Sequence, residues 1–122
     1  VWVGLSLHAQ AQLLLSDYVQ HYGLVRNRCD DGRPEPVAAA HSWNARQPAS
    51  SAMMLNAPRH SDHHAHPMRP YPALCLPEDA PMLPASLPVM AVVALVPPLW
   101  RRIMDPRLAA LHADLRQGLA AS

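Results

Sequence analysis

The stretch Arg59-His60-Ser61-Asp62-His63-His64-Ala65-His66 contains four of the eight histidines in this chain of 122 residues. Three of these four form an H-x-x-H-H pattern. Residues three and four positions apart lie on the same face of a helix, so the imidazoles of His60, His63 and His64 would converge on one point. Imidazole nitrogens bind zinc, copper, iron and nickel. The pattern therefore predicts a metal site and leaves the identity of the metal open.

The flanking residues predict that this stretch belongs to a helix over residues 56–66. Asn56 is a favourable N-cap, and Pro58 stands in the first turn, where its missing N–H costs nothing. Pro67 cannot continue a helix and would end it. The histidines would then project from one regular element of structure.

The composition bounds the size of the protein and its class of partner. The chain has room for one domain with a modest hydrophobic core. Its ten basic residues are all Arg, and its net charge of +1 gives no reason to expect a nucleic-acid partner. Cys29 and Cys75 are far apart, so we expect free thiols in a reducing compartment. The chain begins with Val1 inside an apolar run, so we expect a piece of a longer protein. This run lacks the basic start and the small-residue cleavage site of a signal peptide.

Residues 1–24 are predicted to form one helix that stops at Gly23. Apolar residues cover most of its circumference, and one polar stripe follows successive steps of four residues. This pattern is typical of a membrane-embedded helix whose stripe faces other helices, so we expect the end of a transmembrane span. A buried helix of a soluble protein is the alternative. Arg26 and Arg28 after the helix are typical of a cytoplasmic boundary.

The remaining segments alternate between polar, Pro-rich and short apolar stretches. Residues 25–58 are rich in turn formers and are expected to be a loop, and residues 67–88 an irregular Pro-rich segment. Residues 87–122 are expected to form interfacial or cytoplasmic helices, because their apolar run is too short for an ordinary span. Within them, Asp105-Pro106 is a helix-start signal. The expected fold class is therefore all-α: part of a membrane-embedded helical bundle with irregular Pro-rich connections.

Further motifs accompany the histidine pattern. Residues 18–24 read Tyr-Val-Gln-His-Tyr-Gly-Leu, residues 41–44 read His-Ser-Trp-Asn, and residues 99–107 read Leu-Trp-Arg-Arg-Ile-Met-Asp-Pro-Arg. With residues 59–64, they resemble in order and rough spacing the H-Y-G-L, H-S-W-N and R-H-S-D-H-H motifs and the closing segment of the integral-membrane alkane hydroxylases (alkane 1-monooxygenases). The resemblance covers nearly the whole chain.

This resemblance implies an all-helical membrane enzyme with two iron ions in a non-haem di-iron centre, which inserts one oxygen atom of O2 into the terminal C–H bond of an alkane or alkyl chain. Carried over residue by residue, the iron ligands would be His21, His60, His63 and His64. The family's other ligands belong to motifs that precede this region. The chain therefore resembles the C-terminal part of a single hydroxylase domain, residues 1–122, and is expected to be inactive alone.

The resemblance also implies partners and a location. The electron donor would be rubredoxin or a ferredoxin-type protein with its reductase. The enzyme would be a multi-pass protein of the bacterial inner membrane, in contact with membrane lipid, with its active site on the cytoplasmic side.

Five more residues are expected to support the ligands. Asp17, where the family has Asn, stands one helical turn before the histidine of H-Y-G-L and could orient that imidazole through its second ring nitrogen. His41 is expected to form hydrogen bonds or close a loop, and Trp43 and Asn44 to fix that loop over the site. Asp62 is expected to project away from the ligand face, where it could accept a hydrogen bond from a ligand histidine of another helix.

The sequence leaves three alternatives open. Fatty-acid desaturases and xylene-type hydroxylases of membranes also use H-x-x-H-H, although H-Y-G-L and H-S-W-N argue against a desaturase. A soluble zinc-binding module would use the histidines of residues 60–66, fold in water and bind one zinc ion. An inactive truncated product would have no activity at all. The hydroxylase hypothesis instead predicts aggregation without detergent and weak iron binding by the chain alone.

Overall fold

The computed structural model describes residues 1–120, with the side chains of residues 1–117, and its regular structure is helical. Within these residues the β-type pairings are two isolated bridges, Arg28 with Pro34 and Asn44 with Met82. The expected all-α class is therefore confirmed. The helices are α1 (Trp2–His21), the 3-10 helix η1 (Ala39–His41), α2 (Pro48–Met53), α3 (His60–Ala65), the 3-10 helix η2 (Tyr71–Ala73), α4 (Leu87–Ala94) and α5 (Pro97–Ala120).

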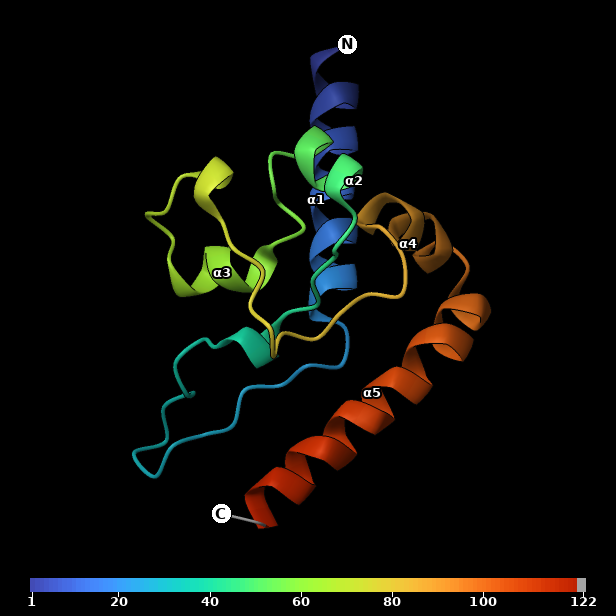
Figure 1. Ribbon diagram of the computed structural model, residues 1–122. Coiled ribbons are helices and arrows are strands. Elements are labelled where there is room, and N and C mark those ends of the chain that lie inside the picture. The colour runs from blue at the N-terminus through green and yellow to red at the C-terminus, as the bar shows by residue number, and fades with distance from the viewer. Residues whose placement is uncertain (121–122) are drawn as a thin grey trace.

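The two long helices, α1 and α5, are joined through α4, which packs against both. Figure 1 shows α4 between them, with α3 on the other side of α1 in this view. The core lies where the last turns of α1 meet α4, the start of α5 and the loop after η1. Its buried hydrophobic residues are Val19, Trp43, Ala45, Leu83, Leu87, Met90, Trp100 and Met104. The core therefore lies beside the C-terminal end of α1, where His21 is found.

The chain turns after α1 at Gly23. Its φ of +69° is a left-handed conformation that glycine adopts without strain. A Cβ atom at this position would also collide with the side chain of Leu108 on α5. Both observations agree with a helix stop here, although the helix expected over residues 1–24 already ends at His21. The close approach places α5 directly against the end of α1.

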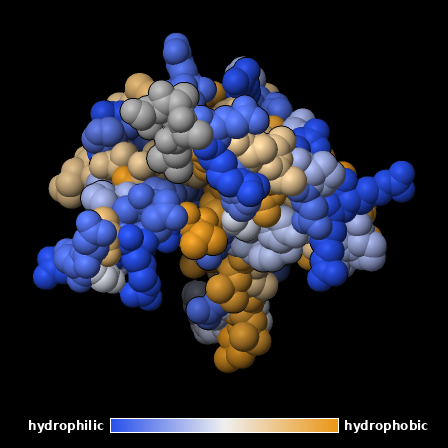
Figure 2. Space-filling view, turned by 90° about the horizontal axis from the view of Figure 1, so that it is seen from below, coloured by the Kyte–Doolittle hydropathy of each residue, from blue (hydrophilic) through white to orange (hydrophobic). Residues whose placement is uncertain are grey.

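Much of the apolar surface of the protein lies on α1 and around α4. No helix within residues 1–120 combines the length and the apolar character that a membrane crossing requires. The face in Figure 2 is mostly hydrophilic, with hydrophobic residues gathered at the lower edge of the view. The exposed large hydrophobic residues on and next to these two helices are Val1, Trp2, Val3, Leu5, Leu7, Leu13, Leu14, Tyr18, Val89, Val92, Leu95 and Val96.

The middle of the chain is more regular than expected, and the histidine helix is shorter. Residues 25–58 contain η1 and α2. The helix expected over residues 56–66 spans only His60–Ala65, because Asn56 has a φ of +62° and does not cap it. Its side-chain amide donates instead to the carbonyl of Tyr71 at 3.0 Å. Asparagine tolerates the left-handed region better than most residues, so Asn56 makes a turn before the helix.

The C-terminal helix also differs from the expectation. The prolines at 97–98 begin α5, because proline costs nothing in a first turn. Pro106, expected near a helix start, lies inside α5. It removes one backbone hydrogen bond, and the guanidinium of Arg107 donates to a carbonyl of the preceding turn at 2.7 Å. One helix therefore replaces the expected break. The expected helical segment 87–122 extends beyond the described residues at 121–122.

Candidate metal centre

Three histidines, one from the end of α1 and two from α3, meet at the end of α1, and we refer to His21, His60 and His64 as the histidine cluster. One ring nitrogen of each lies within 4.8 Å of the others. Nε2 of His60 is 3.1 Å from Nε2 of His21 and 2.9 Å from Nε2 of His64. Nitrogens bonded to one ion at about 2.0–2.1 Å stand roughly 3–3.4 Å apart. The separations of Nε2 of His60 from the other two nitrogens are therefore close to those of ligands of a single metal ion.

A backbone carbonyl orients the ring of His21. Nδ1 of His21 lies 3.2 Å from the carbonyl oxygen of His41. A carbonyl only accepts, so Nδ1 carries the proton and Nε2 presents a lone pair. Ligand histidines commonly donate their other N–H in this way. The bond holds His21 in the form that binds a metal through Nε2.

The cluster cannot satisfy its own nitrogens with hydrogen bonds. Because Nε2 of His21 has no proton, its contact with His60 is a hydrogen bond only if His60 donates. In that case Nε2 of His60 has no lone pair left for His64. Only one of the two short contacts is therefore an ordinary hydrogen bond, whereas a cation between the rings would satisfy all three lone pairs.

Burial keeps the α3 histidines of the cluster neutral. Burial, followed by the neighbouring rings of His64, His21 and His63, lowers the pKa of His60 to about 3. The pKa of His64 is also below its usual value, first through burial and then through His21 and His63. Only a neutral imidazole offers a lone pair to a metal. Both residues are thus in the ligand form at neutral pH.

His63 does not join the histidine cluster. Its ring stacks on Tyr71 with 5.3 Å between the ring centroids, and lies 6.4 Å from the ring of His60 and 6.0 Å from that of His64. Nδ1 of His63 is buried and has no hydrogen-bond partner among the described residues. Leaving a buried polar atom unpaired is costly. This nitrogen is therefore free to accept a hydrogen bond or to bind a ligand of its own.

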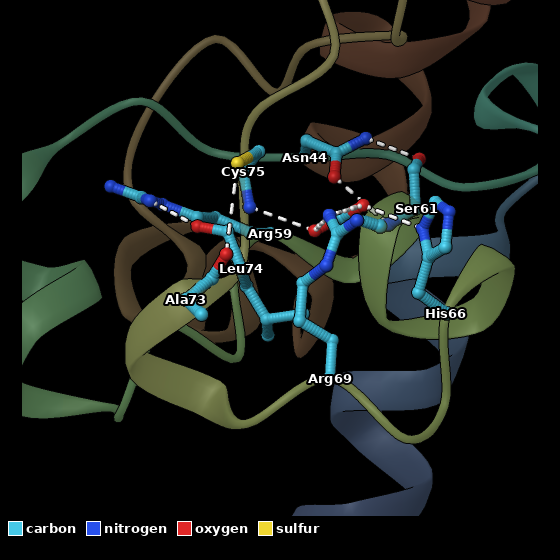
Figure 3. Close-up of polar contacts among 9 residues, drawn as sticks. Asn44, Arg59, Ser61, His66, Arg69, Ala73, Leu74 and Cys75 are labelled. Carbon is cyan, nitrogen blue, oxygen red and sulfur yellow. Dashed lines mark hydrogen bonds and ion pairs between the residues drawn. The ribbon is translucent and has the colours of Figure 1, made fainter.

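Asn44 fixes the first turn of α3. Its Oδ1 accepts the backbone N–H of Ser61 at 3.0 Å, and its Nδ2 donates to the Ser61 hydroxyl at 2.7 Å (Figure 3). Both residues are completely buried, with 0% of their surface exposed. Since Ser61 directly follows His60, the amide of Asn44 sets the position of the turn that carries the histidine cluster.

Trp43 fastens the same loop to the end of α1. Its backbone N–H donates to the carbonyl of Gln20 at 2.7 Å, and its indole Nε1–H donates to the carbonyl of Tyr22 at 2.8 Å. The last carbonyls of a helix lack partners within the helix, and these two flank His21. Trp43 therefore closes α1 at the residue that enters the cluster.

The ring of His41 holds the loop that presents its carbonyl to His21. Nδ1 of His41 accepts the backbone N–H of Ala38 at 2.9 Å. Nε2 therefore carries the proton, and it donates to Oε1 of Glu35 at 2.9 Å. His41 thus closes a loop through hydrogen bonds.

Glu35 supports the site although the sequence pattern did not single it out. Its Oε1 also accepts the backbone N–H of Asn27 at 2.9 Å. The pKa of the Glu35 carboxyl lies below its usual value because of the hydrogen bond from Asn27 and, against the effect of burial, the bonds from His41. Its only signal in the sequence is its place between Pro34 and Pro36, which suggested no more than a turn.

Asp62 anchors α3 to the segment that follows it. Its carboxylate accepts hydrogen bonds from Arg69 Nη1 at 2.6 Å, from His66 Nδ1 at 2.9 Å and from the backbone N–H of Cys75 at 2.8 Å. Burial acts to raise its pKa, but Cys75, Arg69 and His66 outweigh burial and hold the pKa below its usual value. These partners, and no ligand histidine of another helix, are what Asp62 binds within residues 1–120.

Asp17 lies on the Nε2 side of the His21 ring. Its Oδ1 is 3.6 Å from Nε2 of His21, and its side chain is 67% exposed. The second ring nitrogen, which Asp17 was expected to orient, is held by the carbonyl of His41. That expectation was wrong, because the turn of α1 directs the carboxylate to the other nitrogen.

Comparison with known proteins gives these residues a family. Residues 1–92 match the family model described as fatty acid desaturase. Over 111 residues, or 91% of the chain, the sequence is 43% identical to alkane 1-monooxygenase 2 of Alcanivorax borkumensis. Over 112 residues, or 92% of the chain, it is 41% identical to alkane 1-monooxygenase 1 of Pseudomonas aeruginosa. Over 93 residues, or 75% of the chain, it is 32% identical to the xylene/toluene monooxygenase hydroxylase component of Pseudomonas putida.

The match covers the whole histidine cluster but only part of each relative. The chain spans 29% of the length of the two alkane 1-monooxygenases and 24% of the xylene/toluene relative. His21, His60 and His64, and the loop that positions them, lie within the residues that match the family model. The chain belongs to the fatty acid desaturase family, and within that family it is similar to the alkane 1-monooxygenases.

Proposed function

We propose that this chain is part of a membrane-bound, non-haem di-iron monooxygenase that hydroxylates the terminal C–H bond of alkanes or alkyl chains with O2. The observation that carries the proposal is the histidine cluster, in a sequence 41–43% identical to alkane 1-monooxygenases. Because the chain spans 29% of these relatives, the complete centre would include residues from the rest of the enzyme.

The donor set fits iron. Imidazole is a ligand that suits iron, and neutral imidazoles leave the positive charge of the ion uncompensated. His21, His60 and His64 would hold one ion, and His63 would contribute its unpaired nitrogen to a second. When bound, the iron would supply the activation of O2 and the oxidation of the C–H bond. The chain's own residues would keep the ligand nitrogens deprotonated and fix their separation.

The supporting residues would act by positioning. Asn44 holds the turn of α3, Trp43 holds the end of α1, and the carbonyl of His41 keeps the proton of His21 on Nδ1. Together they would hold the two helix ends at the separation that one ion requires. Ligand orientation by such outer groups typically changes metal affinity about 10–100-fold.

The proposed location and substrate agree with the exposed apolar surface of α1 and α4. Lipid and neighbouring helices of the full enzyme would cover this surface, and an alkane would approach through the lipid phase. Arg26 and Arg28 follow α1, as basic residues do on the cytoplasmic side. We therefore place the enzyme as a multi-pass protein of the bacterial inner membrane. Its electron donor would be rubredoxin or a ferredoxin-type protein with a reductase.

A chimera tests this function. The chain would replace the matching region of an alkane 1-monooxygenase relative, in a host without a hydroxylase of its own. We expect the chimera to bind iron and to form a primary alcohol from an alkane. A His60→Ala chimera present in the membrane at the same level should form none. A chimera that binds iron and oxidises no alkane would contradict the proposal.

A second candidate substrate is favoured by the 32% identity to the xylene/toluene relative. The same chimera would be offered toluene or xylene in competition with an alkane. Preferential oxidation of the aromatic compound would support this alternative, and formation of an unsaturated acyl chain would support a desaturase. A chain that folds without detergent and binds one zinc ion would instead support a zinc-binding module.

A further inference from the structure

We propose that Asp105 of α5 is a positioning residue for the histidine cluster, and that it acts by holding Tyr22, the residue after His21. This inference rests on the proposed metal site and gives that site a support from α5, a helix that carries none of the three histidines. It also gives a role to the segment at residues 99–107, the last of the sequence motifs, in which Asp105 stands.

The position of His21 depends on how the end of α1 is held, because His21 is the last residue of that helix. Helix ends fray, since their last carbonyls lack partners within the helix. Trp43 binds the backbone carbonyls of Gln20 and Tyr22, but it leaves the side chain of Tyr22 to other contacts. If this turn moved, the ring of His21 would lose its separation from the nitrogens of α3.

The first turn of α5 holds the ring of Tyr22 by packing. The ring of Trp100, which is completely buried, lies 5.2 Å from that of Tyr22 and nearly perpendicular to it, at 84°. The ring of Tyr18 is 5.5 Å from that of Tyr22 and 5.6 Å from that of Trp100. Edge-to-face pairs at about these separations are favourable. The three rings therefore hold the last turn of α1 against the first turn of α5.

Asp105 fixes the far end of the same ring. The hydroxyl of Tyr22 donates to Oδ1 of Asp105 at 2.7 Å, the usual distance for a hydroxyl donor. A hydrogen bond to a charged acceptor is stronger than one between neutral groups. Packing alone allows an aromatic ring to shift within its own plane, and a bond at the end of the ring opposes this shift. Because Asp105 is exposed, we expect its effect to be moderate.

The same helix makes a further contact just beyond Tyr22. Leu108 lies so close to Gly23 that a Cβ atom at Gly23 would collide with its side chain. Asp105 and Leu108 are three residues apart and therefore share a face of α5. This face thus holds two consecutive residues, Tyr22 and Gly23, directly after the residue that enters the cluster.

A double-mutant cycle tests the proposal on the full chain in detergent, titrated with Co²⁺ alone. Asp105→Ala removes the acceptor, and Tyr22→Phe removes the donor but keeps the ring. We expect each to weaken Co²⁺ binding by about threefold to tenfold, less than the loss of a group that binds a metal ligand directly. Because both variants remove the same bond, the double variant should bind no more weakly than either single variant. Asp114→Ala, also exposed on α5, is the matched control and should bind as the unmodified chain does.

Two further measurements separate positioning from folding stability. Asp105→Asn keeps an oxygen that can accept from Tyr22, so its Co²⁺ affinity should be close to that of the unmodified chain. The visible bands of Co²⁺ depend on the geometry of its ligands, so Asp105→Ala should shift them and Asp105→Asn should not. A role confined to folding would lower the denaturation midpoint of the metal-free Asp105→Ala chain and leave the bands of the bound ion unshifted.

The outcomes separate this inference from the metal site on which it rests. If Co²⁺ binds the cluster but Asp105→Ala matches Asp114→Ala in affinity, or leaves the bands unshifted, Asp105 does not position His21 and the cluster stands. The same conclusion follows if the effects of Asp105→Ala and Tyr22→Phe add in the double variant. If the unmodified chain binds Co²⁺ no better than the His60→Ala chain, the metal site itself is wrong, and the positioning role of Asp105 with it.

Discussion

The two faces of helix α3 differ in whether their polar side chains have ordinary hydrogen-bond partners within the protein. On one face, His60 and His64 direct nitrogens at each other and at His21, with contacts of 2.9 and 3.1 Å that cannot both be ordinary hydrogen bonds. On the other face, Ser61 pairs with a buried amide, and Asp62 accepts donors from three residues of the following segment. The polar groups of one face have partners within the protein, whereas the nitrogens of the other face are those of the candidate metal site.

We infer that one face of α3 anchors the helix and that the other face carries the candidate metal ligands. A helix of six residues is too short to be stable on its own, so the anchoring face must fix it in place. The histidine face can then keep lone pairs close together, which is unfavourable without an ion. Substitutions on the two faces should therefore have different effects: loss of folding stability on one, and loss of metal affinity on the other.

Removal of the anchor should have the largest effect. Asp62→Ala would leave the charge of Arg69 and the N–H of Cys75 without their partner, and we expect it to lower the free energy of unfolding by about 2–4 kcal/mol. Denaturant unfolding of the metal-free chain in detergent measures this. Asp79→Ala, at an exposed position, is the control. Equal stability of the Asp62→Ala and Asp79→Ala chains would contradict the anchoring role.

Removal of a cluster histidine should act on metal binding instead. We expect His60→Ala to weaken Co²⁺ binding by more than about 100-fold, because a direct ligand contributes at least as much as the groups that orient it. The unfolding free energy of the metal-free chain should change by less than about 1 kcal/mol, since one unsatisfied nitrogen contact is lost. Competition with a chromophoric chelator measures the affinity. A loss of stability as large as that of Asp62→Ala would remove the distinction between the faces.

A smaller effect is expected where the support for the cluster is indirect. Glu35 acts through the ring of His41, whose carbonyl orients His21. We expect Glu35→Ala to weaken Co²⁺ binding by up to about tenfold. Glu35→Gln, which keeps an acceptor oxygen, should bind nearly as the unmodified chain does, and Glu78→Ala serves as the exposed control. Identical Co²⁺ affinity for all of these chains would show that the loop around His41 keeps its conformation without Glu35.

The smallest expected effect is a change at low pH in the contribution of Asp62 to folding stability. The pKa of Asp62 in the folded chain is below its ordinary value of 3.8, so its stabilising effect is present above that value. This contribution is lost as the pH falls through the lower pKa of the folded state. The stability difference between the unmodified chain and Asp62→Asn should therefore shrink as the pH falls below 3.8. Denaturant midpoints at a series of pH values test this, and a constant difference would contradict it.

Helical periodicity predicted the part of the site that one helix can define. His60 and His64 are four residues apart and share a face of α3 as the sequence pattern indicated. His63 did not follow, because its ring direction depends on stacking against Tyr71 in a segment outside the helix. A sequence pattern within one helix cannot predict a contact with a residue outside that helix.

The groups that orient the cluster were harder to predict, because several act through the backbone. Every residue has a carbonyl, so nothing in the sequence marks that of His41 as the acceptor for His21. The proline positions were also ambiguous, because a proline can begin a helix, interrupt one or lie within one. The pair at 97–98 begins α5, and Pro106 lies within it. For residues 67–88, the high proline content was enough to predict an irregular segment, and the chain is mostly irregular there between η2 and α4.

The isolated bridge between Asn44 and Met82 has a consequence for the order of events during synthesis. The backbone N–H of Asn44 donates to the carbonyl of Pro81, and its carbonyl accepts the N–H of Leu83, each at 2.8 Å. A chain leaving the ribosome presents His21 long before these partners emerge. The loop that clamps α3 is complete only once Leu83 is available. A metal ion bound at the proposed site would therefore find the loop complete only after residues up to Leu83 have been translated.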